Sequence, residues 1–179
     1  MTISGSFEHM TPATYEPRVE ESEIFMDSDE PTVNLDLLVE HMISYASYLN
    51  QLYLQTHLVH LNVEGPLFLQ IHKFLQKQYE KHIEQFDALS EFVRSLDYLM
   101  PIDAKQLHQA CKGFKNVKSY DTREMLTVYV KNLEDAGMRA KDLSKIAEQA
   151  GAVDVENYLQ ELVGIMFKDA WFIKATLRD

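Results

Sequence analysis

The chain of 179 residues contains few cysteines, glycines and prolines. Its single cysteine, Cys111, excludes an internal disulfide and any cysteine-based zinc finger, and it fits a reducing, cytoplasmic setting. Only six glycines and five prolines are spread along the chain, so few positions break a helix. With 46% hydrophobic residues, the chain is long enough for one domain with a full core. These numbers predict a single domain built from long helices.

Charge is missing from the stretch 41–63, which contains no Asp, Glu, Lys or Arg. The stretch is long enough to cross a bilayer, but its three histidines and several amide and hydroxyl side chains make it too polar for a membrane span. The N-terminus has neither the basic start nor the apolar run of a secretory signal. A helix without charge on any face is typical of one surrounded by protein. We therefore expect no membrane association, and we expect this helix to pack against a bundle on one side and a neighbouring subunit on the other.

Basic residues are almost absent from residues 1–34, which carry eight acidic side chains against Arg18 alone. This composition predicts an acidic N-terminal arm that is extended or partly disordered, followed by a helical domain over residues 35–179. Because an acidic arm repels phosphate, direct DNA binding is not expected. We interpret the lysine-rich stretch around Gly113 as a solvated loop rather than a nucleic-acid site.

Helix caps and breaks divide the helical domain into four long helices and one short helix. In order, the expected helices run from about Asn34 to before Gly65, from Pro66 to about Leu99, from Asp103 to about Ala110, from Asp121 to Gly151, and from about Asp154 onward. Asp121 with Glu124 three residues later has the spacing of a capping box. The pattern predicts an all-α four-helix bundle, in which the connection between the second and third long helices crosses the length of the bundle.

Four potential metal ligands follow one another along the chain: His60, His72, Asp87 and Glu91. Two imidazoles with two carboxylates suit non-haem iron, manganese or zinc. Asp87 and Glu91 share one helix face, and a turn at Gly65-Pro66 can bring the two histidines together. However, the fifteen residues from His72 to Asp87 contain no helix breaker, so a continuous helix separates them by about 22 Å. If the four residues form one centre, the histidines of one chain meet the carboxylates of another, most simply across a two-fold axis that gives two equivalent sites.

A wider set of residues surrounds these four positions: His57, Asn62, Gly65, Phe68 and Tyr79. Together with the four potential ligands, they resemble the signature of the Dps family, the small twelve-subunit ferritins. The resemblance extends over about residues 35–176 and leaves out the acidic arm. It implies a ferritin-like four-helix bundle with a short extra helix between helices two and three. It also implies a homo-oligomer of twelve subunits, with ferroxidase centres at its two-fold interfaces.

The resemblance implies a function in iron storage and detoxification under oxidative stress. The chain would be a ferroxidase, an oxidoreductase that oxidises metal ions, with up to two iron ions per site and zinc as a substitute. Hydrogen peroxide would be the preferred oxidant and oxygen the slower one, and ferric mineral would collect inside a hollow shell. The alternatives are a structural shell or scaffold with a vestigial metal site, or a DNA-protecting member that does not bind DNA directly.

Three positions near the ligands bear on the mechanism. His57 faces the same way as His60, where it either joins or supports the ligands or has a packing role. Gln76 stands one turn after His72, where family members often have an Asp that assists the second iron. Because an amide oxygen is a weaker ligand for a hard cation than a carboxylate, we expect the second metal to bind loosely. Leu61 stands where family members often have Trp, so the radical-quenching role of that indole is absent.

Two further observations concern the rest of the chain. Asp142, Asp154 and Glu161 are candidates for an acidic three-fold pore, although helix capping and the helix dipole explain acidic residues near a helix start equally well. No Glu is followed three residues later by His. This absence argues against the intrasubunit di-iron centre of conventional ferritins, which uses Glu-x-x-His motifs.

Overall fold

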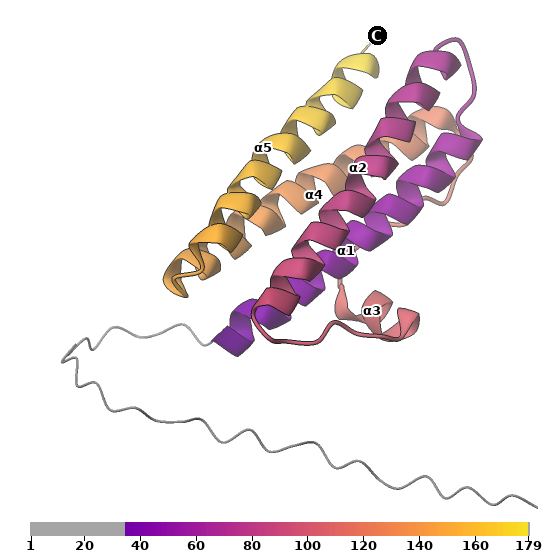
Figure 1. The fold of residues 1–179 in the computed structure, drawn as a ribbon. Coiled ribbons are helices and arrows are strands. Elements are labelled where there is room, and N and C mark those ends of the chain that lie inside the picture. The colour runs from indigo at the N-terminus through magenta and orange to yellow at the C-terminus, as the bar shows by residue number, and fades with distance from the viewer. Residues whose placement is uncertain (1–34, 179) are drawn as a thin grey trace, which may run out of the picture. The chain divides into compact units, whose positions relative to one another are not determined.

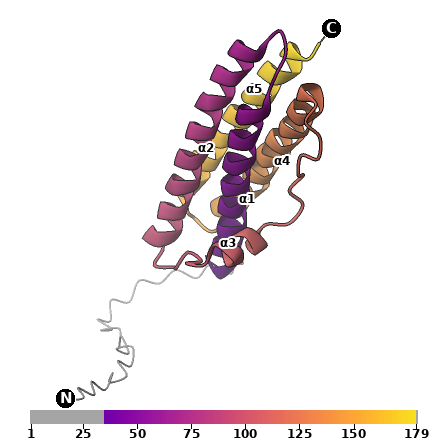
Figure 2. The same ribbon diagram turned by 90° about the vertical axis from the view of Figure 1, so that its right-hand side faces the viewer.

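The computed structural model of the protein describes residues 35–178, which form five α-helices. They are α1 (Leu35–Asn62), α2 (Phe68–Ser95), α3 (Ala104–Ala110), α4 (Thr122–Gln149) and α5 (Val153–Thr176). Figures 1 and 2 show the four long helices side by side, with the short α3 at one end of the bundle. The predicted all-α four-helix bundle, with its extra short helix between the second and third long helices, is confirmed. The predicted acidic arm, residues 1–34, lies outside the described residues.

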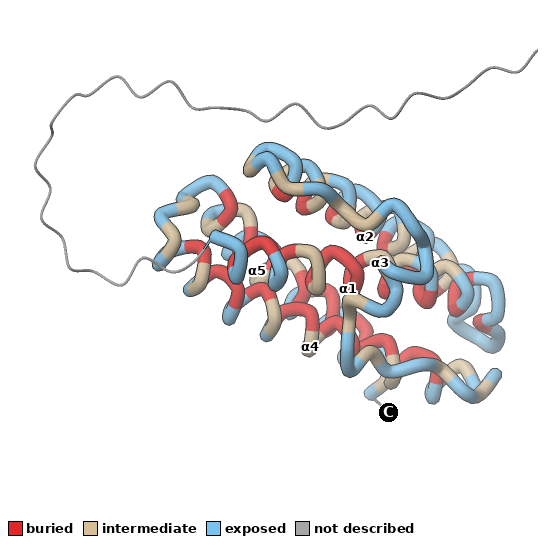
Figure 3. The backbone as a smooth tube through the Cα atoms, turned by 90° about the horizontal axis from the view of Figure 1, so that it is seen from below, coloured by how far each residue is buried: buried red, intermediate tan, exposed pale blue. Residues whose placement is uncertain are grey.

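The bundle consists of two helical hairpins. α1 packs against α2, α4 packs against α5, and α1 also contacts α3 and α4. The segment between α2 and α4 returns along the side of the bundle and includes α3 (Figure 2). Buried hydrophobic side chains from all four long helices form one core, and Figure 3 shows the buried stretches facing the centre of the bundle. None of the helices in residues 35–178 is sufficiently long and apolar to span a membrane.

Helix α2 begins two residues later than predicted. Pro66 lies in the turn between α1 and α2, where the amide of Phe68 donates to the carbonyl of Gly65 at 3.0 Å. This hydrogen bond closes a turn around Pro66 and leaves Phe68 as the first helical residue. The fixed φ of proline suits a turn as well as a first helical position, so the sequence pattern did not distinguish the two.

The predicted end of α2 near Leu99 is also wrong. Asp97 has a φ of 66°, in the left-handed region that glycine usually occupies at a helix end. The amides of Asp97 and Tyr98 donate to the carbonyls of Arg94 and Val93 at 3.1 and 3.3 Å. This pair of bonds is a Schellman motif, and it stops the helix at Ser95 without a glycine.

Three other helix boundaries have the caps that the sequence predicts. The carboxylate of Asp103 accepts a hydrogen bond from the amide of Gln106, and that of Asp121 accepts one from the amide of Glu124. These bonds satisfy amides that have no partner inside the helix. Gly151, with a φ of 70°, ends α4 in a second Schellman motif.

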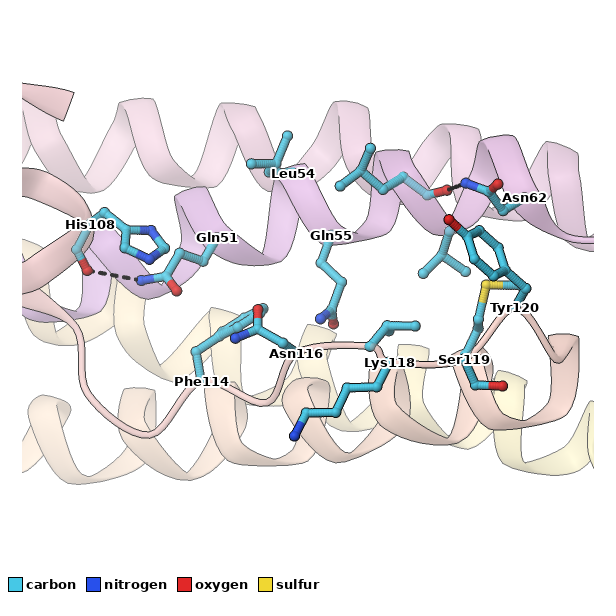
Figure 4. A pocket seen from close by; sticks show the side chains of 14 residues that line it. Gln51, Leu54, Gln55, Asn62, His108, Phe114, Asn116, Lys118, Ser119 and Tyr120 are labelled. Atoms are coloured by element: carbon cyan, nitrogen blue, oxygen red, sulfur yellow. Dashed lines mark hydrogen bonds between the residues drawn. The ribbon is translucent and has the colours of Figure 1, made fainter. Parts of the chain in front are cut away.

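Asn132, a fully buried residue of α4, anchors the segment between α3 and α4. Its amide nitrogen donates to the side-chain oxygen of Gln55 and to the carbonyl of Lys115, both at 2.8 Å. Its amide oxygen accepts from the amide of Lys115 at 3.1 Å and from the hydroxyl of Tyr48 at 3.3 Å. One side chain therefore joins α1, α4 and the connecting segment. Figure 4 shows Gln55 reaching from α1 toward this segment.

We expect Asn132→Leu to destabilise the protein by about 2–4 kcal/mol, because it removes the partner of the Lys115 amide and leaves the buried Gln55 oxygen without one. Urea unfolding at fixed protein concentration measures the loss. The matched control is Asn116→Leu in the exposed part of the same segment, which should change stability by less than about 0.5 kcal/mol. Equal stability of the two variants would show that the Asn132 bonds do not hold the segment.

A layer of polar side chains crosses the middle of the bundle around His82. Both nitrogens of this fully buried ring are engaged: Nδ1 donates to the side-chain oxygen of Gln85 at 2.9 Å, and Nε2 accepts from the hydroxyl of Tyr129 at 3.0 Å. On α5, the buried carboxylate of Asp169 accepts from Gln78 at 3.2 Å and from Lys81 at 2.7 Å. Burial lowers the pKa of His82 to about 4, so the ring is neutral near pH 7.

This pKa predicts a loss of stability in acid. The unfolded chain binds a proton at His82 near pH 6.5, whereas the folded chain binds it only near pH 4. The contribution of neutral His82 to the free energy of unfolding is therefore fully present above pH 6.5. It is lost as the pH falls to about 4, and the total loss is about 3 kcal/mol. Urea unfolding between pH 4 and 7 should show a steeper loss for the native chain than for His82→Gln. Coinciding pH profiles of the two proteins would contradict the prediction.

Candidate metal centre

The turn between α1 and α2 positions the candidate centre. Gly65 has a φ of 106°, which a glycine adopts without strain, and the chain reverses direction around it. The hydroxyl of Thr122 donates to the carbonyl of Glu64 at 3.1 Å and accepts from the amide of the same residue at 3.0 Å. These two bonds attach the turn to the first residue of α4, so the ends of α1 and α2 are held from outside the hairpin.

His60 and His72 lie face to face across this hairpin. Their ring centroids are 3.7 Å apart and their planes differ by 23°. Nδ1 of His60 lies 2.9 Å from the carbonyl oxygen of His72, and Nδ1 of His72 lies 3.0 Å from the carbonyl oxygen of His60. The carbonyl of His60 is one of the last four of α1, which have no partner inside the helix. His72 thus provides the hydrogen-bond partner for a carbonyl group at the end of α1.

The reciprocal bonds fix the proton on each ring. A carbonyl oxygen only accepts, so each Nδ1 carries a hydrogen and donates it. In the neutral imidazole the other nitrogen, Nε2, then holds a lone pair. Histidines that bind metals commonly donate their other nitrogen to a carbonyl or carboxylate in this way, which sets the tautomer and the ring orientation. His60 is buried and His72 is half-buried.

Asp87 and Glu91 lie far along the same hairpin, on exposed positions of α2. Because α2 is one unbroken helix from Phe68 to Ser95, the fifteen residues from His72 to Asp87 rise by about 22 Å. Within residues 35–178, no three His, Cys, Asp or Glu side chains come close enough to hold a metal ion together. One chain therefore brings together two of the four predicted ligands and leaves the two carboxylates on the surface.

Tyr79 and His57 form a second stacked pair beside the histidines, with ring centroids 4.2 Å apart and planes 23° apart. Tyr79 also meets the ring of His60 edge-on at 5.3 Å, and Tyr53 lies 6.2 Å from His57. These contacts show that His57 packs between two tyrosine rings, and its role beside the candidate ligands stays a prediction. Sequence reasoning missed the pair, although Tyr53, His57 and His60 follow helical spacing on one face and would have indicated it.

The remaining candidates lie on the surface. The side-chain nitrogen of Gln76 donates to the carboxylate of Glu80 at 3.0 Å, one turn further along α2. Asp142 forms an ion pair with Lys145 at 3.1 Å on the exposed face of α4. Asp154 and Glu161 are exposed on α5, and Asp154 lies in the first turn of that helix. Exposed carboxylates at these places remain compatible with either a pore or ordinary helix capping.

The comparisons with known proteins agree on the family. The family model of a ferritin-like domain matches residues 43–179. The DNA protection during starvation protein of Helicobacter pylori is 23% identical over 127 residues, which cover 70% of this chain and 88% of that protein.

The solved structures support the same fold. Dps from Thermosynechococcus elongatus has a TM-score of 0.77 and 20% identity, covering 81% of this chain and 92% of its own. The Dps protein from Vibrio cholerae O1, described as a member of a superfamily of ferritin-like diiron-carboxylate proteins, has a TM-score of 0.74 and 18% identity, covering 84% of this chain and all of its own. The chain therefore belongs to the ferritin-like family, and its fold is that of Dps proteins.

Proposed function

We propose that the protein is a mini-ferritin of Dps type that oxidises ferrous iron at a centre shared between two subunits. The proposal depends on the histidine pair. Nδ1 of His60 and Nδ1 of His72 each donate a hydrogen bond to a carbonyl oxygen, so Nε2 of each ring keeps its lone pair. Membership of the ferritin-like family supports iron as the metal. The carboxylates of Asp87 and Glu91 from the two-fold mate would complete the ligand set.

A second copy of the chain is the natural cover for the exposed side of α1. Leu54, Leu58 and Leu61 are 52%, 53% and 64% exposed and follow one another along that helix. Beside them lies a groove of about 380 Å³ between α1 and the segment before α4 (Figure 4). Its lining includes Leu54, Leu58, Phe114, Val117, Tyr120 and Met125. A contiguous apolar surface of this kind favours a protein partner, and a two-fold mate would place its own α2 near the histidines.

The ligand set suits the oxidation of ferrous iron. Carboxylates stabilise the higher charge of the ferric product, and the imidazoles supply two neutral donors. Two ferrous ions together supply the two electrons that reduce one hydrogen peroxide molecule, with two protons, to two waters. Because both electrons arrive together, no hydroxyl radical is released. Oxygen would be the slower oxidant, and the ferric product would collect as mineral in the hollow interior of a twelve-subunit shell.

The two metal positions of such a centre would differ in their affinity for iron. Gln76 offers an amide oxygen where a carboxylate would bind a hard cation more tightly, and its amide nitrogen is engaged by Glu80. We expect one position to bind iron firmly and the other loosely. Zinc would compete for the firm position, since mixed nitrogen and oxygen ligands suit it as well. Asp142, Asp154 and Glu161 are the pore residues we propose for iron entry.

The first test is iron loading with hydrogen peroxide, followed by size exclusion with iron detection. The native chain should elute as a large assembly that carries iron, and Asp87→Asn with Glu91→Gln should slow uptake about ten-fold or more by removing both anionic ligands. The matched control is Glu84→Gln with Asp97→Asn, which removes the same charge from one exposed position of α2 and one exposed position just beyond its end. If the ligand variant and the control mineralise alike, a scaffold with a vestigial site replaces the proposal.

A mixing experiment tests whether the site is shared. One variant carries His60→Ala and His72→Ala, and the other carries Asp87→Asn and Glu91→Gln. Each alone should take up iron about ten-fold or more slowly than the native chain, but a two-fold interface between them contains one intact site, formed by the histidines of one chain and the carboxylates of the other. Random mixing makes half of the interfaces mixed, and half of their sites are intact, so refolded mixtures should recover about a quarter of native activity. A mixture as inactive as its parents would exclude a shared site.

A further inference from the structure

The side chain of Thr122 joins two parts of the chain that lie 58 residues apart. Its hydroxyl donates to the carbonyl of Glu64 and accepts from the amide of the same residue. Because a hydroxyl is donor and acceptor at one atom, Thr122 engages both backbone groups of Glu64 at once. The turn between α1 and α2 is thereby bonded to the start of α4, a helix outside the α1–α2 hairpin.

The start of α4 holds Thr122 in a fixed position. Thr122 is the first residue of this helix, directly after the N-cap Asp121. The carboxylate of Asp121 accepts from the amide of Glu124 at 2.8 Å, and its carbonyl accepts from the amide of Met125 at 2.9 Å. Met125 is buried in the core. The hydroxyl of Thr122 is therefore presented to the turn from a capped and packed helix end.

The turn itself has open space beside it. Val63 is buried at the end of α1, but the residues that follow it, 64–67, are all exposed. A hollow of about 630 Å³ lies between the turn and the exposed Tyr120, and its lining includes Glu64, Gly65 and Phe68. The hydrogen bond from Phe68 to Gly65 lies inside the turn and does not attach it to another helix. The two bonds of Thr122 therefore restrain a segment that side-chain packing leaves free to shift.

The position of the turn determines how His60 and His72 face each other. Glu64 follows His60 by four residues and precedes His72 by eight, so the turn connects the end of α1 to the start of α2 between the two rings. The rings stack at 3.7 Å, and each Nδ1 lies 2.9 or 3.0 Å from the carbonyl oxygen of the other residue. A shift of about 1 Å between the two helix ends would break these reciprocal bonds, because a hydrogen bond weakens beyond about 3.2 Å.

We propose that Thr122 is a positioning residue for the histidine pair. By fixing the turn, it keeps the Nε2 lone pairs of His60 and His72 in the arrangement that binds a metal ion. Thr122 acts through Glu64 and is not itself a ligand. Ligands that are already in place bind more tightly, since less ordering is required when the ion binds. The inference rests on the metal centre of the proposed function and deepens it.

The test is a titration of the assembled full-length protein with Co²⁺, without iron or oxidant. Co²⁺ suits imidazole and carboxylate ligands, and its visible absorption depends on the ligands that bind it. The chain with His60→Ala and His72→Ala identifies the part of the spectrum that belongs to the histidine pair. Thr122→Val removes the hydroxyl at nearly constant shape, and Thr122→Ser keeps it. The matched control is Thr127→Val, because the Thr127 hydroxyl donates only to the Arg123 carbonyl one turn earlier in α4, at 2.7 Å.

We expect Thr122→Val to weaken Co²⁺ binding at the histidine pair about three- to ten-fold. This is less than the roughly 10- to 100-fold loss typical when a ligand loses its direct hydrogen-bond partner, since Thr122 acts at one remove. Thr122→Ser should restore the native affinity, and Thr127→Val should keep it. Urea unfolding of the same variants should show similar midpoints, because Glu64 is exposed and water can replace the hydroxyl at its amide and carbonyl.

The outcomes separate this inference from the proposed function. Weaker binding in Thr122→Val alone, with similar stability throughout, supports the positioning role. Equal affinity of Thr122→Val and Thr127→Val, or a loss that Thr122→Ser does not restore, overturns it and leaves the metal centre in place. A loss of affinity that follows a matching loss of stability also overturns it, because Thr122 would then be structural only. If the native chain shows no Co²⁺ absorption that depends on His60 and His72, the proposed centre fails and the positioning role with it.

Discussion

The unbroken length of α2 is the constraint on which the candidate centre depends. No glycine or proline interrupts the helix between Phe68 and Ser95, so His72 and Asp87 stay about 22 Å apart in any conformation that keeps the helix. A chain that carries candidate ligands far apart on one unbroken helix cannot bring them together by folding further. In the proposed centre, a second copy of the helix, related by a two-fold axis and running in the opposite direction, would bring them together. The same rigidity that separates the ligands thus determines how a partner must approach.

The two hydrogen bonds between His60 and His72 serve the fold and the site together. Each ring satisfies a backbone carbonyl of the other residue, and the His60 carbonyl would otherwise lack a partner at the end of α1. The same bonds assign the hydrogen of each ring to Nδ1 and leave Nε2 with its lone pair. Replacing either histidine therefore removes a helix-end contact as well as a candidate ligand. Loss of activity in such a variant needs a stability measurement beside it, whereas Asp87 and Glu91, exposed on α2, can be changed without this complication.

The sequence predicts the parts of the molecule that depend on neighbouring residues. The N-caps at Asp103 and Asp121 and the stop at Gly151 are local, and each occurs where the pattern places it. The predicted end of α2 was wrong because Asp97 adopts a left-handed conformation that the residue type does not indicate. The hydrogen bonds of Asn132 and His82 join helices distant in the sequence, so no local pattern reveals them. The ligand spacing predicts a shared centre, but the ring contacts of Tyr79 required the packed hairpin.

The polar groups in the interior of the bundle differ from those of the proposed metal centre. Among the described mid-bundle polar groups around His82, Gln78 Oε1 and Gln85 Nε2 lack a partner, but the imidazole and the carboxylate are engaged. The lone pair of His82 Nε2 accepts the Tyr129 hydroxyl, and the ammonium of Lys81 compensates the buried charge of Asp169. A cation placed there would have to displace a hydrogen bond or face the ammonium group, at a cost of several kcal/mol. His60 and His72 have the opposite arrangement, because their hydrogen bonds use Nδ1 and keep Nε2 available. The histidines thus differ in the nitrogens that form hydrogen bonds, and this difference favours His60 and His72 as the ligands of the proposed centre.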